Sequence, residues 1–116
     1  MGNFKKKHSF SKRLEEANRI LRKYPNKIPI IVQEGSRYKL PKLQKIKYLV
    51  PEDITMGQFM FVIRKRMKLK PEMSLILFIN NNKIIANQTI LGDVYTKEKD
   101  LDNFLYMHVC QESTFG

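Results

Sequence analysis

The residue that is most clearly suited to a chemical reaction is the last one, Gly116. The chain ends with residues 112–116 (ESTFG), so its final carboxylate belongs to a residue without a Cβ atom. A flexible tail that ends in glycine can enter a narrow enzyme channel and present this carboxylate for activation, transfer to a thiol and attachment to an amine. A frayed chain end without chemistry is the alternative. The rest of the sequence has to decide between the two.

No other part of the sequence supports a catalytic site. It contains no glycine-rich phosphate loop, no paired-histidine metal motif and no nucleophile with a neighbouring base. His8 and His108 are far apart in the sequence, and Cys110 is expected to be structural. We therefore predict a protein that is not an enzyme and that uses no metal and no cofactor.

Length, cysteine content and hydropathy together predict a single cytoplasmic domain. A chain of 116 residues, 42% of them hydrophobic, can bury one modest core. The N-terminus is basic rather than apolar, and no apolar run approaches the roughly 18 residues of a membrane span. We therefore expect neither a signal peptide nor a spanning helix. Cys110 is the only cysteine, which excludes an internal disulfide.

Positive charge is concentrated in the first half of the chain. Residues 1–50 hold 14 Lys and Arg against 3 Asp and Glu, whereas residues 51–116 hold 8 of each kind. A basic half predicts an anionic partner, which could be nucleic acid, anionic lipid or an acidic peptide; a solvated cationic face is the alternative. Nucleic-acid binding would use Tyr38 and Tyr48 as stacking residues, but no RNA- or DNA-binding motif is present.

Hydrophobic periodicity predicts three helices and five strands. Apolar residues recur at helical spacing in residues 11–24, and Thr55 with Gln58 is typical of a capping box that opens a second helix. A short third helix is predicted at 90–98. Pro29 indicates a sheet edge or a strand end, because proline cannot donate a ladder hydrogen bond. The β-rich runs that predict strands are residues 28–32, 47–50, 75–79, 84–85 and 104–109.

This order of elements predicts an α+β fold. A strand pair, a helix and a closing strand pair place one helical layer on a mixed sheet. The order fits the ubiquitin-like β-grasp with an N-terminal helical extension. The extension would be residues 1–25, and residues 26–116 would be the ubiquitin-like domain with a flexible tail at 112–116, all in one structural unit.

Several segments carry a more specific resemblance. The chain resembles the autophagy-related ubiquitin-like modifiers, the family of light chain three of the microtubule-associated proteins and of the GABA-receptor-associated protein. The matching segments follow the family's order and spacing from about residue 10 to the end. They are residues 23–31, 47–51, 57–59, 62–66, 78–81, 104–106 and 114–116.

The resemblance implies a function for Gly116 in autophagosome formation. Its carboxylate would become amide-linked to phosphatidylethanolamine on autophagosomal membranes, after thioesters with an activating and a conjugating enzyme. A cysteine protease would process and deconjugate the chain. Two acyl chains suffice for stable anchoring where one does not. The protein would be a cytoplasmic monomer with a lipid-anchored pool on the autophagosome, and on the vacuole or lysosome.

The resemblance also implies that the chain is an adaptor. Receptors with an acidic aromatic-x-x-aliphatic peptide would add a strand beside residues 47–50. Because side chains alternate along a strand, two pockets would flank this edge, one on each face. The first pocket would comprise Glu16, Ile20, Pro29, Lys47, Leu49 and Phe104. The second would comprise Tyr48, Val50, Pro51, Ile54, Phe59 and Val62.

Further contacts follow from the same resemblance. Lys47 and Arg66 would meet the acidic residues beside the peptide motif. Tyr24, Phe78 and Phe115 would contact the processing and conjugation enzymes. The alternative for the pocket residues is that the most apolar of them only form the core. Phe61 is expected in the core in either case.

Overall fold

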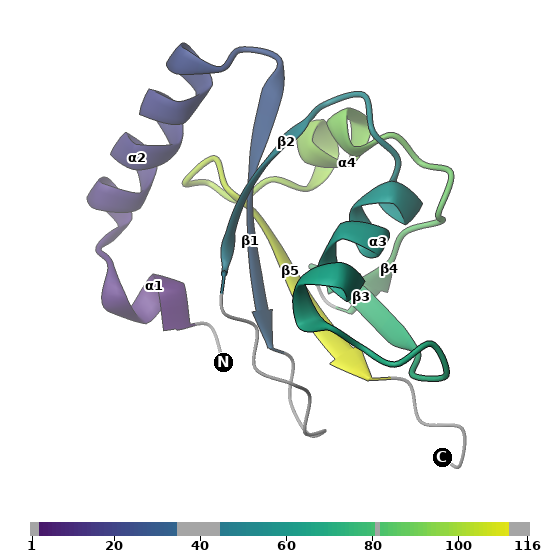
Figure 1. The fold of residues 1–116 in the computed structure, drawn as a ribbon. Helices are drawn as coiled ribbons and strands as arrows, with labels where there is room; N and C mark the ends of the chain where they lie inside the picture. The colour runs from purple at the N-terminus through teal and green to yellow at the C-terminus, as the bar shows by residue number, and fades with distance from the viewer. Residues whose placement is uncertain (1–2, 35–44, 81, 112–116) are drawn as a thin grey trace.

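The computed structural model describes residues 3–34, 45–80 and 82–111 (Figure 1). The predicted order of helices and strands is confirmed from α2 onward, with boundaries that shift by one or two residues, and a short helix, α1, precedes them. The elements are α1 (Asn3–Lys7), α2 (Phe10–Lys23), β1 (Lys27–Glu34), β2 (Lys47–Pro51), α3 (Met56–Met67), β3 (Leu75–Ile79), β4 (Lys83–Ile84), α4 (Leu91–Glu98) and β5 (Leu105–Gln111).

The strands form one mixed sheet in the order β2-β1-β5-β3-β4, which confirms the α+β class. β1 pairs antiparallel with β2 and parallel with β5, and β3 pairs antiparallel with both β5 and β4. Figure 1 shows α1 and α2, in purple, on one side of this sheet and α3, in teal, on the other. The two helical layers therefore cover opposite faces.

Pro29 does not mark a sheet edge, because β1 lies between β2 and β5. The Val32 N–H bonds to the carbonyl of Ile46 on the β2 side. Alternation then directs the Pro29 nitrogen toward β5, where the pairing begins only at Ile30. Pro29 thus lies near the start of β1, at a position where no ladder donor is needed.

The main core lies between the sheet and α3. Alternate residues of β1 and β5 face this side, and Met56, Phe59, Ile63 and Met67 of α3 close it, each 0 to 2% exposed. The predicted capping box at the start of α3 is present, with Gln58 N–H donating to Thr55 Oγ1 at 3.1 Å and Thr55 N–H donating to Gln58 Oε1 at 2.8 Å. It fixes the rotation of the helix that supplies this apolar stripe.

The expectation that Phe61 lies in the core is wrong. Its side chain is 62% exposed. Phe59 and Ile63 already face the sheet, and a residue midway between them along a helix lies on the opposite face. α3 is apolar around much of its circumference at this point, so the sequence pattern alone did not separate its inner and outer faces.

A second, smaller core attaches the N-terminal helices to the other face of the sheet. Phe4, Ala17, Ile31, Phe104 and Tyr106 are buried together there, with Phe4 edge-on to Phe104 at 5.3 Å between ring centroids.

In the described part of the chain, no helix is long and apolar enough to cross a bilayer.

A buried carboxylate reinforces this attachment. Asp102 is fully buried and accepts hydrogen bonds from Arg13 Nη1 at 2.5 Å, the Tyr106 hydroxyl at 2.5 Å and the Phe104 N–H at 2.9 Å. Burial, together with the bond to Asp102, raises the pKa of the Tyr106 hydroxyl well above its ordinary value. Tyr106 therefore stays protonated and keeps donating.

Replacing Asp102 with alanine should destabilise the protein by about 3 kcal/mol, because it leaves the largely buried Arg13 guanidinium without its partner. Urea unfolding followed by circular dichroism would measure this change. Lys83→Ala, which breaks the solvent-exposed pair with Glu98, is the matched control and should leave the midpoint nearly unchanged. Equal midpoints for Asp102→Ala and wild type would contradict the assignment of Asp102 as a structural anchor.

Candidate functional site

The outer edge of β2 is open in the described part of the chain. β2 lies at the end of the sheet and pairs only with β1. An edge strand of this kind presents unpaired N–H and C=O groups that an extended peptide can use. Its side chains alternate as expected, with Tyr48 and Val50 buried on the α3 side and Lys47 and Leu49 more exposed on the other.

The residues of the first predicted pocket gather on the α2 side of β2. Pro29 lies opposite Leu49 in the strand register, and Lys47 Nζ pairs with Glu16 Oε2 of α2 at 2.6 Å. Ile20 packs against the buried cluster that contains Phe104. Pro29 and Phe104 are buried, so they can form only the floor of such a pocket.

The residues of the second predicted pocket lie between β2 and α3. Tyr48 and Phe59 meet edge to face at 5.6 Å between ring centroids. Phe59 is fully buried and Val50 nearly so, which makes them core residues that underlie the surface. The more exposed members, Pro51, Ile54 and Val62, surround this floor.

The two cations predicted to meet an acidic flank differ in their surroundings. Lys47 is already neutralised by Glu16, so an incoming carboxylate must displace that partner. Arg66 is exposed, takes part in no ion pair with a described residue, and lies close enough to act on Tyr48 electrostatically. Lys45, which the sequence analysis did not single out, holds its Nζ 5.5 Å from the centre of the Tyr48 ring.

Tyr48 is unsuited to stack a nucleic-acid base. Its side chain is only 5% exposed, and its ring packs on Phe59. Its hydroxyl is buried without a hydrogen-bond partner in the described residues, and burial raises its pKa. Tyr38, the other stacking candidate, lies outside the described residues. The nucleic-acid hypothesis therefore loses the one aromatic candidate that the structure describes.

The remaining predicted contacts are dispersed. Tyr24, at the end of α2, is 37% exposed and has Lys23 and Lys27 near its ring. Phe78 is half-buried and lies opposite His108 in the register of β3 and β5. Phe115 and Gly116 lie outside the described residues.

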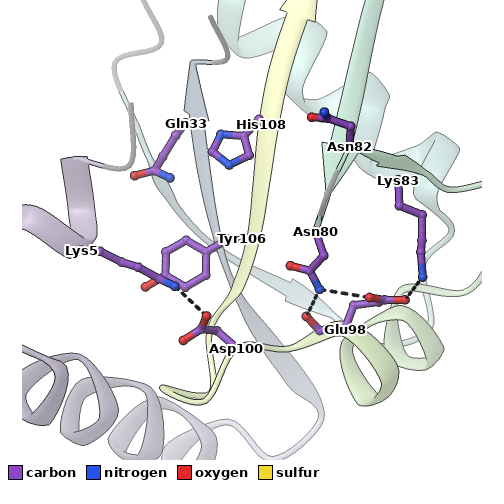
Figure 2. Close-up of a pocket in the computed structure, with 9 residues that line it drawn as sticks. All are labelled: Lys5, Gln33, Asn80, Asn82, Lys83, Glu98, Asp100, Tyr106 and His108. Carbon is purple, nitrogen blue, oxygen red and sulfur yellow. Dashed lines mark hydrogen bonds and ion pairs between the residues drawn. The ribbon is translucent and has the colours of Figure 1, made fainter.

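The structure also contains a polar cavity of about 680 Å³ that sequence reasoning missed. Figure 2 shows it on the sheet face opposite α3, between α1 and the β3–β4 turn. Gln33 and His108 line its floor, and the pairs Lys5–Asp100 (2.6 Å) and Lys83–Glu98 (2.7 Å) flank it. No motif announces it, because its residues come from well-separated segments.

The side chains that line the cavity are not those of a metal site. No group of three or more His, Cys, Asp or Glu among the described residues could hold a metal ion. Both carboxylates at its rim are occupied by lysines, and partial burial lowers the pKa of His108 below its ordinary 6.5. At neutral pH the imidazole is therefore neutral, and the cavity offers hydrogen bonds rather than net charge.

Comparisons with known proteins agree with the geometry. The family model described as "Autophagy protein Atg8 ubiquitin like" matches residues 12–116 of this chain. Autophagy-related protein 8 of Mycosarcoma maydis is 46% identical over 113 residues, which cover 97% of this chain and 95% of the relative. This chain belongs to the Atg8 family. Its autophagy-related, ubiquitin-like character, expected from the sequence, is thereby shown.

Solved structures of Atg8 proteins share the whole fold. The structure of Trypanosoma brucei ATG8 superposes with a TM-score of 0.89 at 36% identity, covering 97% of both chains. Plasmodium falciparum Atg8, solved in complex with a P. falciparum Atg3 peptide, gives a TM-score of 0.88 at 33% identity over 97% of this chain and 98% of that one. The β-grasp fold predicted from the sequence is confirmed, and Atg8 proteins are ubiquitin-like modifiers.

Acidification should lower the free energy of unfolding of this Atg8 protein, in part through His108. Below about pH 6.5 the unfolded chain takes up a proton at His108 before the folded chain does, so the free energy of unfolding falls as the pH drops from 6.5 toward the lowered pKa of the folded state. His108→Gln should flatten this slope, as measured by urea unfolding at a series of pH values. His8→Gln is the matched control, because it removes the chain's other, exposed imidazole. An unchanged slope in His108→Gln would refute the assignment.

Proposed function

We propose that this Atg8 protein is conjugated through Gly116 to phosphatidylethanolamine on autophagosomal membranes and acts there in autophagosome formation. The observation that carries the proposal is the family match, which extends over residues 12–116 and so includes the tail. The chemistry needs an accessible carboxylate on a residue that can pass a narrow channel, and glycine meets that need. The protein would be a cytoplasmic substrate of the conjugation enzymes, with a lipid-anchored pool on the autophagosome.

The gain from conjugation is large enough to hold the protein on a membrane. Burial of each acyl CH₂ group contributes about 0.8 kcal/mol, and phosphatidylethanolamine supplies two chains at once. One chain alone gives only marginal, reversible binding. Conjugation and deconjugation would therefore switch the protein between the cytoplasm and the membrane.

The open edge of β2 supports a second role as an adaptor. A receptor peptide with the pattern aromatic-x-x-aliphatic would pair with β2, directing the aromatic residue to the α2 side and the aliphatic residue to the α3 side. Acidic residues beside the motif would meet Arg66 and Lys45, which are exposed beside Tyr48. Lys47 would join them by exchanging Glu16 for a carboxylate of the peptide.

The enzymes of the conjugation cycle are the other proposed partners. The P. falciparum relative is described in complex with an Atg3 peptide. By analogy, this chain would bind its own conjugating enzyme, besides an activating enzyme and a processing cysteine protease. Tyr24 and Phe78 are proposed as contacts for these enzymes, and their partial exposure is compatible with that role.

Gly116→Ala should abolish conjugation, because the added Cβ obstructs passage of the tail into the active sites that process it. A gel-shift assay with purified activating and conjugating enzymes and phosphatidylethanolamine vesicles would measure this loss. Ser113→Ala, in the same tail, is the matched control and should be conjugated at close to the wild-type rate. Normal conjugation of Gly116→Ala would exclude Gly116 as the reactive residue.

Leu49→Ala should weaken binding of an acidic aromatic-x-x-aliphatic peptide about tenfold, because it truncates a partly exposed side chain of the proposed first pocket. Isothermal titration calorimetry would give the affinity. Leu101→Ala offers a matched control, since Leu101 is 86% exposed in the α4–β5 connection and belongs to neither predicted pocket. Unchanged affinity for Leu49→Ala would show that the peptide binds elsewhere.

A further inference from the structure

The second half of the chain is neutral overall, yet its cations are clustered. Five of its eight Lys and Arg residues fall within residues 64–70, where there is no acidic residue. They occupy the last turn of α3 and the residues just after it. None of these five cations forms an ion pair with a described residue. They are Arg64, Lys65, Arg66, Lys68 and Lys70.

Of these five cations, Arg64 has a structural role, and the other four are available to bind an external anion. Arg64 donates to the backbone carbonyls of Met73 at 2.6 Å and of Lys70 at 3.2 Å, so it organises the α3–β3 connection. Lys65, Lys68 and Lys70 are exposed. Glu72 is the one acidic residue between Arg64 and the start of β3, so the local charge remains clearly positive.

An exposed aromatic ring lies within this basic surface. Phe61 is 62% exposed, and Lys65 Nζ lies 5.4 Å from its ring centroid. Phe61 and Lys65 are spaced by four residues, so they share one face of α3, and Lys68 follows directly after the helix as its C-cap residue. An aromatic side chain combined with lysines is the composition of helices that lie in a membrane interface.

The position of this surface points to a membrane rather than to another anion. Leu75, which begins β3, lies opposite Gln111, which ends β5, so the α3–β3 connection is at the end of the molecule from which the tail departs (Figure 1). Gly116 lies five residues beyond Gln111, and a chain of that length spans at most roughly 17 Å. Given the conjugation proposed above, this end of the protein is held close to the lipid headgroups.

We propose that Phe61, Lys65, Lys68 and Lys70 form a membrane face that binds the anionic phospholipids of a leaflet. The lysines meet lipid phosphates and carboxylates, and Phe61 inserts among the headgroups. Arg66 is not included, because its charge acts on Tyr48 of the proposed peptide site. Binding through this face would fix the orientation of the conjugated protein and leave the open edge of β2 free for a peptide.

The test uses the full chain without conjugation enzymes, so that its outcome is independent of lipid conjugation. Flotation with phosphatidylcholine vesicles, with and without phosphatidylserine, measures the affinity. Neutralising the face with Lys65→Gln, Lys68→Gln and Lys70→Gln should weaken binding to the phosphatidylserine vesicles about tenfold or more. The matched control removes three exposed cations from α2 with Arg19→Gln, Arg22→Gln and Lys23→Gln, and should weaken it less than about threefold.

A second pair of variants tests the aromatic contribution. Phe61→Ser should weaken vesicle binding about threefold, whereas Leu101→Ser, at a more exposed leucine away from α3, should not. Thermal melting verifies that the variants remain folded. Equal losses of vesicle affinity in the α3 and α2 triple variants would overturn the proposal, because they would show that any exposed cation contributes equally to binding. The proposal would also fail if the α3 variant lost binding to a generic RNA but kept its affinity for vesicles.

Discussion

The burial of β1 on both of its faces is the constraint on which the rest of the structure depends. Six consecutive residues, Ile28 to Gln33, are buried, because α3 packs on one side of the strand and α1 with α2 on the other. β1 also pairs along both edges, with β2 and with β5. Since β1 and β5 occupy the centre, β2 remains at the edge, flanked by α2 on one face and α3 on the other. Both proposed peptide pockets follow from this arrangement.

The N-terminal helices therefore belong to the site as much as to the fold. A ubiquitin-like sheet with one helical layer would leave the α2 side of β2 open to solvent. Here Asp102, through Arg13 and Tyr106, and Phe4, through Phe104, hold the helices against that face. This attachment places Glu16 beside Lys47, where it would form a wall of the proposed first pocket. If the proposed first pocket binds a peptide, loss of the attachment would affect that binding without any change in β2.

Local rules made the fold predictable, and tertiary contacts limited how much of the site could be predicted. The capping box at Thr55 and the alternation along β2 depend on near neighbours, and both were right. The prediction that Phe61 lies in the core was wrong, because α3 carries apolar residues on its outer face as well. Only the packing reveals which stripe of the helix meets the sheet. The pocket residues came from family resemblance rather than from spacing. The polar cavity was missed, because Gln33 and His108 meet only once β1 and β5 have paired.

The positions of the tail and the peptide edge explain how one small domain could serve two partners at once. The tail follows β5, the central strand, whereas the open edge belongs to β2, at the end of the sheet. A lipid attached through the tail and a peptide paired with β2 would therefore not compete for the same backbone. The cations are divided in the same way: Lys45 lies beside Tyr48 and the charge of Arg66 acts on it, whereas Lys65 lies beside the exposed Phe61 ring on the outer side of α3. The two proposed uses of charge on this protein would therefore be separable.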